Sequence, residues 1–132
     1  MKKVDKILLI DDDSIANFVN RYLITGLDLT HELLIMHNVP SAKQVLLSTI
    51  EKLDDEQLKE CVILLDAKLE HYNELLPSNL LPNLPSPEKE SLYLIMVSYN
   101  KFEDPSLSFS LEYTLDKPVT REKLSLAWNK IS

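Results

Sequence analysis

The sequence has few of the residues that mark secreted or membrane proteins. Cys61 is the one cysteine among 132 residues, so no disulfide can form within the chain. A lone thiol is typical of the reducing cytosol. No apolar run approaches the roughly 18 residues of a membrane span. The short run 7–10 is followed by three aspartates, which does not fit a signal peptide. We therefore expect a cytoplasmic protein with no membrane partner.

Basic residues are also scarce relative to acidic ones. The chain carries 14 Lys and Arg against 21 Asp and Glu, a net charge of −7 at pH 7, and it has no basic cluster. Direct binding of nucleic acid needs a basic face, so we expect no nucleic-acid partner. The length fits one domain over residues 1–132, and the apolar and charged content is that of a soluble globular domain.

Short apolar runs alternate with segments of helical spacing, which is the pattern of a parallel α/β sheet. The predicted strands are 7–10, 33–36, 62–65, 92–97 and 111–115. The predicted helices begin near Ser14, at Ser41 as N-cap, and after Thr120. In the first helix, one set of residues has the spacing of an apolar face: Ile15, Phe18, Val19, Tyr22 and Leu23. Gly26, the only glycine, is expected to cap its end.

A proline-rich segment separates the third and fourth predicted strands. Four of the seven prolines fall between Pro77 and Pro87, and a regular helix does not survive that density. We predict a short helical piece at 72–76 and then an irregular loop over about 77–90. Loops of this length are often functional in compact domains.

Polar residues stand where the predicted strands end. Asp11 and Asp12 follow the first strand, Asp66 ends the third, Ser98 ends the fourth and Lys117 follows the fifth. In open parallel sheets, ligands bind outside the carboxyl ends of the strands, at a topological switch point. The sequence therefore predicts a pocket at this edge of the sheet.

The residue types in this pocket point to phosphate chemistry. Three crowded carboxylates repel one another unless a cation neutralises them, and all-oxygen ligands with vacant positions suit Mg²⁺. A carboxylate can attack phosphorus, and Mg²⁺, the Ser98 hydroxyl and the Lys117 ammonium would then bind the phosphoryl oxygens. Taken singly, Asp66 could be a turn residue and Lys117 a surface lysine. The aspartates 11–13 could be a helix N-terminal cluster, with Asp13 as the N-cap.

Four segments together resemble the response-regulator receiver domain: ILLIDDDSIANFVNRYLI, CVILLDAK, LIMVS and LDKP. The resemblance covers essentially the whole chain. It implies a flavodoxin-like α/β fold, in which a doubly wound five-stranded parallel sheet of order 2-1-3-4-5 lies between two helix layers. It also implies a cis peptide bond between Lys117 and Pro118.

The resemblance assigns roles to the strand-end residues. Asp66 would accept the phosphoryl group, Ser98 would be the switch hydroxyl and Lys117 would bind phosphate. Asp12 would bind Mg²⁺ directly and Asp11 would reach it through water or as a second carboxylate. Asp66 and the backbone carbonyl of Lys68 would complete the metal ligands.

The sequence also departs from the family pattern. Glu70 and Glu74 stand where the family usually has a proline and a glycine after the phospho-acceptor. Tyr99 replaces the usual small residue after the switch hydroxyl, where its ring could slow the loss of phosphate. Thr114 replaces the common aromatic residue. These changes affect the family's usual signalling surface and leave the predicted phosphorylation residues in place.

The predicted function is that of a stand-alone receiver. A histidine kinase or a phosphotransfer protein would donate the phosphoryl group in a Mg²⁺-dependent phosphorelay, and a monomer or weak homodimer would signal through an output protein that the sequence does not identify. The domain would catalyse its own phosphotransfer and autodephosphorylation, and would not be an enzyme acting on a separate substrate. Two alternatives stay open. One is a receiver-like scaffold that no longer cycles phosphate. The other is a haloacid-dehalogenase-like phosphatase that uses Asp11 and Asp13.

Overall fold

The computed structural model describes residues 1–75, 92–98 and 114–131. Its elements are β1 (Val4–Ile10), α1 (Ser14–Gly26), β2 (Thr30–Met36), α2 (Val39–Asp54), β3 (Cys61–Asp66), the 3-10 helix η1 (Tyr72–Leu75), β4 (Leu92–Ser98), β5 (Thr114–Asp116) and α4 (Arg121–Ile131). The strands are parallel and lie in the order β2-β1-β3-β4-β5, which confirms the predicted fold class. The predicted loop 77–90, Tyr99 and residues 111–113 lie outside the described residues.

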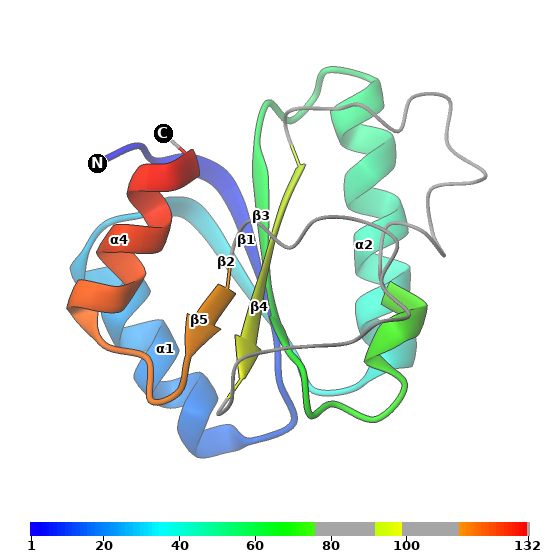
Figure 1. The fold of residues 1–132 in the computed structure, drawn as a ribbon. Coiled ribbons are helices and arrows are strands. Elements are labelled where there is room, and N and C mark those ends of the chain that lie inside the picture. The colour runs from blue at the N-terminus through cyan, green and yellow to red at the C-terminus, as the bar shows by residue number, and fades with distance from the viewer. Residues whose placement is uncertain (76–91, 99–113, 132) are drawn as a thin grey trace.

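Helices cover both faces of the sheet. α1 and α4 lie on one face and α2 lies on the other (Figure 1). Successive side chains of β1 enter different cores: Leu8 and Ile10 pack on the α2 side, whereas Ile7 and Leu9 pack with Trp128 of α4. Because both faces are covered, the central strands are continuous apolar runs, which is why they stand out in the sequence.

α1 turns most of its apolar residues outward. Ile15 is 74% exposed, Phe18 72% and Tyr22 69%, with Val19 at 42%. We call these four residues the α1 face. The buried residues of the helix are instead Asn17, Asn20 and Ile24, which share one side at three- and four-residue spacing. The helix predicted from the apolar spacing is present, but its most apolar side does not form the core.

The end of α1 corrects the expectation for Gly26. Gly26 is the last helical residue, and the residue with left-handed backbone is Asp28, at φ 54°. The N–H of Asp28 donates to Thr25 O at 3.1 Å, and the N–H of Leu29 donates to Ile24 O at 3.3 Å. This bond pattern needs a left-handed residue two positions beyond Gly26, and a short polar side chain such as Asp tolerates that conformation. At the end of α2, Glu56 has the same role, with φ 60°.

The start of α2 corrects the expectation for Ser41. The N-cap is Asn38, whose side-chain oxygen accepts the Ser41 N–H at 3.0 Å. The helix begins before Pro40 because a proline needs no N–H partner in the first turn. The other two caps are as predicted. Asp13 accepts N–H bonds at the start of α1, and Thr120 Oγ1 accepts the Lys123 N–H at the start of α4.

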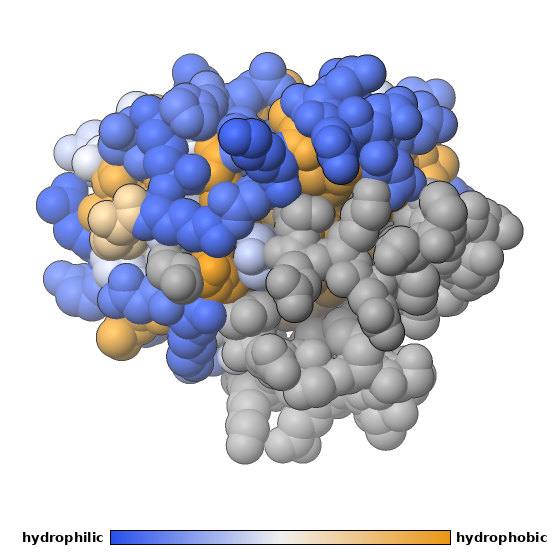
Figure 2. Space-filling view, turned by 90° about the horizontal axis from the view of Figure 1, so that it is seen from above, coloured by the Kyte–Doolittle hydropathy of each residue, from blue (hydrophilic) through white to orange (hydrophobic). Residues whose placement is uncertain are grey.

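The strands begin at the opposite end of the sheet from the predicted pocket. Figure 2 looks onto this end, where hydrophilic residues cover most of the described surface. Cys61 begins β3 and is fully buried, and burial raises the pKa of its thiol to about 12. It is therefore a small packing residue. None of the helices in the described ranges combines the length and apolarity that a membrane span needs.

Candidate functional site

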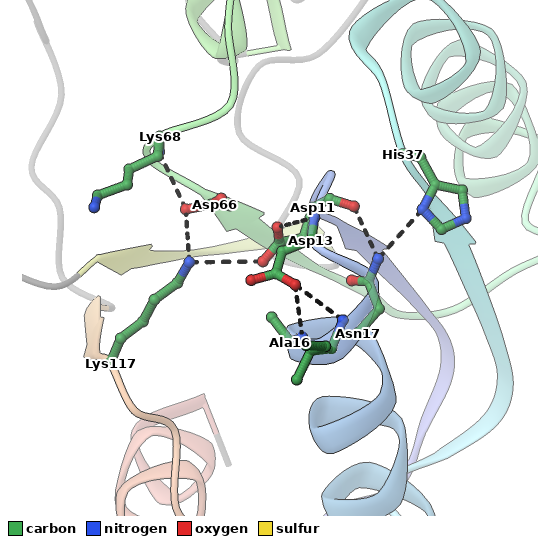
Figure 3. A network of polar contacts seen from close by, with 9 residues as sticks. Asp11, Asp13, Ala16, Asn17, His37, Asp66, Lys68 and Lys117 are labelled. Carbon is green, nitrogen blue, oxygen red and sulfur yellow. Dashed lines mark hydrogen bonds and ion pairs between the residues drawn. The ribbon is translucent and has the colours of Figure 1, made fainter.

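The carboxyl ends of the strands bring the predicted polar residues together. Asp11 directly follows β1, Asp66 is the last residue of β3, and Ser98 is the last residue of β4. Lys117 follows β5, and its side chain extends back across this edge toward the aspartates (Figure 3). The chain crosses from one face of the sheet to the other between these strands, so this edge is the switch point at which a ligand pocket is expected.

Three carboxylates meet at this edge. Asp11, Asp12 and Asp66 each offer one oxygen, and these oxygens all lie within 4.8 Å of one another. Asp11 and Asp66 are buried at 2% and 4% exposure, whereas Asp12 is exposed. Solvent can reach this set of oxygen donors from the side of Asp12. Such a set fits Mg²⁺, because this ion keeps several waters when it binds protein carboxylates. The residues present therefore fit the predicted ion.

Lys117 is the cation in contact with these carboxylates. Its Nζ lies 3.1 Å from Asp66 Oδ1 and 3.7 Å from Asp11 Oδ2. Among the described residues, three ionised carboxylates and one ammonium leave a charge of −2, which a divalent cation would balance. Burial raises the pKa of Asp11 to about 6, and the Asp66 carboxylate adds to the shift, while the N–H of Asp13 and the charge of Lys117 oppose it.

Backbone groups hold Asp66 from the other side. The N–H of Lys68 donates to Asp66 Oδ1 at 3.1 Å, and the N–H of Leu69 donates to Asp66 O at 3.2 Å. The Lys68 side chain extends away from the carboxylates (Figure 3). Its backbone is thus beside the site, and the proposed metal contact of its carbonyl stays a prediction.

Ser98 and Lys117 are tied through the backbone. The N–H of Lys117 donates to Ser98 O at 2.7 Å, so the ends of β4 and β5 are fixed side by side. The bond between Lys117 and Pro118 is cis, as the resemblance implied. Ser98 therefore lies at the correct edge, and the role of its hydroxyl stays a prediction. Glu70 and Thr114 are exposed.

Asn17 and His37 are not among the residues that the sequence predicts for this site. Asn17 Nδ2 donates to Asp11 O at 2.8 Å and lies 3.3 Å from His37 Nδ1. A cavity of about 530 Å³ opens beside His37 and Asp12, next to the first turn of α2. The available signal was weak: Asn17 and Asn20 are spaced about one turn apart in a helix whose other residues are mostly apolar.

A scan against protein-family models finds no match, and a search of curated proteins finds no significant relative. Solved structures do match. A two-component response regulator from Cytophaga hutchinsonii is 23% identical, with 98% of each chain covered and a TM-score of 0.60. A CheY-like receiver domain from Methylobacillus flagellatus is 16% identical, with 98% of this chain and 100% of that chain covered and a TM-score of 0.62. A chemotaxis response regulator of Vibrio cholerae is 14% identical, with 98% of this chain and 100% of that chain covered and a TM-score of 0.63. The chain therefore has the receiver-domain fold.

Proposed function

We propose that this chain, with its receiver-domain fold, accepts a phosphoryl group on Asp66 in a Mg²⁺-dependent phosphorelay. The observation that carries the proposal is the surroundings of Asp66. This buried carboxylate lies at the switch point, has an ammonium 3.1 Å from Oδ1, and shares its edge with two further carboxylates. With a divalent cation bound beside the Lys117 ammonium, such a site would place positive charge where the phosphoryl oxygens carry negative charge.

In the transfer step, an oxygen of Asp66 attacks phosphorus, for example in a phosphoimidazole of the donor. The new P–O bond forms as the P–N bond breaks, and the electron pair of that bond returns to the imidazole. Asp11, Asp12 and Asp66 would hold Mg²⁺, which supplies neutralisation of the phosphoryl oxygens. The Lys117 ammonium, which pairs with Asp66 in this structure, would bind a phosphoryl oxygen after the transfer. Water attacking phosphorus would later break the P–O bond to Asp66, which releases inorganic phosphate and restores the carboxylate.

The α1 face supports a protein as the phosphodonor. α1 begins directly after the acidic segment, and its apolar face is exposed. A contiguous exposed apolar patch marks a protein interaction site more often than it marks ordinary surface. A histidine kinase or phosphotransfer protein bound there would bring its phosphoimidazole to Asp66. Output would pass to a partner protein in the cytoplasm, and catalysis would be limited to the domain's own phosphorylation and dephosphorylation.

The proposal is tested by intact-mass measurement after incubation with a small phosphodonor, with and without Mg²⁺. Wild type should gain one phosphoryl group only with Mg²⁺, and Asp66→Asn should gain none. Asp28→Asn removes an exposed carboxylate far along the chain and serves as the matched control. Undiminished labelling of Asp66→Asn would overturn the assignment. In a kinase assay, Phe18→Ala should slow transfer from the protein donor and leave labelling by the small donor unchanged.

A second candidate is a receiver-like scaffold that does not cycle phosphate. The departures of the sequence from the family pattern at Glu70, Tyr99 and Thr114 suggest it, although the acidic cluster is kept. Binding of beryllofluoride, a phosphoryl mimic, distinguishes the two, since a scaffold would not respond to it. The geometry does not favour a phosphatase that uses Asp11 and Asp13. Asp13 Oδ1 already accepts the N–H groups of Ile15 and Ala16 as the helix cap.

A further inference from the structure

Asn17 connects three elements next to the acidic cluster. It is 4% exposed and lies on the sheet-facing side of α1. Its Nδ2 is placed between the backbone oxygen of Asp11, at the end of β1, and the ring of His37, just after β2 (Figure 3). Because a carbonyl oxygen can only accept, the side-chain atom facing Asp11 O must be the amide nitrogen. The orientation of the Asn17 amide is thus fixed by its partner.

The same nitrogen also faces the ring of His37. Nδ2 carries two hydrogens, of which one points to Asp11 O and the other to His37 Nδ1, 3.3 Å away. The roles of the two atoms depend on the His37 tautomer, and the contact is a hydrogen bond when Nδ1 is the unprotonated ring nitrogen and accepts. The tautomer is therefore a measurable signature of this contact.

The bond to Asp11 O controls the peptide between Asp11 and Asp12. The N–H of Asp11 donates to Met36 O at 3.1 Å, and the N–H of Asp13 donates to Asp11 Oδ1 at 2.9 Å. Asn17 adds the bond to the Asp11 carbonyl, which lies in the planar unit that leads into Asp12. With that plane held, the directions of the Asp11 and Asp12 side chains are set before any ion binds.

Asn17 is not explained by packing alone. Its Oδ1 is buried and has no hydrogen-bond partner in the described structure. A buried polar atom without a partner destabilises a fold, so an apolar residue would pack here at lower cost. We propose that Asn17 is a positioning residue that orients the Asp11–Asp12 peptide for Mg²⁺ binding. This inference rests on the proposed function for its ion.

The test compares substitutions at Asn17 with the same substitutions at Asn20. Asn17→Ala and Asn17→Leu both remove the donor but change the side-chain volume in opposite directions, so an effect common to both isolates the hydrogen bond. Asn20 is also buried, at 7% exposure, one turn further along the same side. In the described structure it shows no hydrogen bond to the acidic segment, which makes it the matched control.

Mg²⁺ titration followed by NMR should show a dissociation constant raised about tenfold in both Asn17 variants and nearly unchanged in the Asn20 variants. The ring ¹⁵N signals of His37 should show an unprotonated Nδ1 in wild type, and that signal should shift in the Asn17 variants alone. Thermal unfolding monitors the fold, and if one Asn17 variant fails to fold, the other carries the comparison.

Two results would overturn the inference: wild-type Mg²⁺ affinity in the Asn17 variants, or a protonated Nδ1 on His37 in the wild type at neutral pH. If wild type itself binds no Mg²⁺, the proposed function fails and the role of Asn17 toward the ion fails with it. The His37 signal would then still report whether the amide contact exists.

Discussion

Replacing Asp11 by Asn should stabilise the Mg²⁺-free protein in a pH-dependent manner. Burial raises the pKa of Asp11 to about 6, whereas an aspartate in an unfolded chain has a pKa near 3.9. The folded state therefore holds a proton that the unfolded state releases between these values. The stability that this proton contributes is complete below about pH 4 and is lost as pH rises through about 6. A shift of about two units corresponds to about 3 kcal/mol.

The Asn side chain cannot ionise and should avoid this loss. Its oxygen can still accept the N–H of Asp13, which Asp11 Oδ1 accepts at 2.9 Å. Urea unfolding should therefore show Asp11→Asn to be more stable than wild type by about 2–3 kcal/mol near pH 7.5, with the difference close to zero near pH 4. Asp12→Asn removes a carboxylate from the same segment at an exposed position. It should change the free energy of unfolding by less than about 0.5 kcal/mol.

Mg²⁺ offers an independent check on the same variant. An ion that binds only the folded state stabilises it, and wild type should gain more than Asp11→Asn because it keeps the third carboxylate. Saturating Mg²⁺ should therefore reduce the advantage of the variant. A stability gain of equal size near pH 4 and near pH 7.5 would refute the reasoning, because it would show that ionisation of Asp11 is not the cause.

Three further predictions use the same unfolding measurement. Glu56→Gly should stabilise the fold by about 0.5–1 kcal/mol, because the left-handed backbone at this position strains any residue with a Cβ; a loss of stability would contradict that account of the α2 end. Lys117→Met should destabilise by about 3 kcal/mol, because it leaves the buried Asp66 carboxylate without its cation; a cost below about 1 kcal/mol would argue against it. Phe18→Ala should cost less than about 1 kcal/mol, whereas Ile24→Ala should cost about 2–4 kcal/mol, and equal costs would mean that α1 is not oriented as described.

The strands and the candidate site were readable from the sequence because their signals are local. A strand buried on both faces is a continuous apolar run, and the polar residue that ends it marks the edge of the sheet. Asp66 and Asp11 could therefore be assigned to one edge without any structure. The distances between these carboxylates could not be predicted from the sequence, because they depend on the register between strands, such as the pairing of Ile10 with Leu65.

The orientation of α1 was not readable because it depends on contacts distant in the sequence. Helical spacing shows which residues share a side, but it does not show which side meets the sheet. The apolar side of α1 predicts burial of Phe18, yet Asn17 faces inward because Asp11 and His37 supply partners for its amide. The helix ends were missed for a related reason: the left-handed position after α1 falls on Asp28, although Gly26 is available two residues earlier.

The buried thiol of Cys61 makes the natural chain suitable for site-specific labelling. Maleimide and iodoacetamide probes react with the thiolate, and a thiol whose pKa is about 12 is almost entirely protonated at neutral pH. Full burial also keeps reagents away from the sulfur. A cysteine placed on the α1 face, for example by Val19→Cys, would thus be the one reactive thiol without removal of the natural one. A fluorophore attached there would report directly on whether a phosphodonor protein covers that surface.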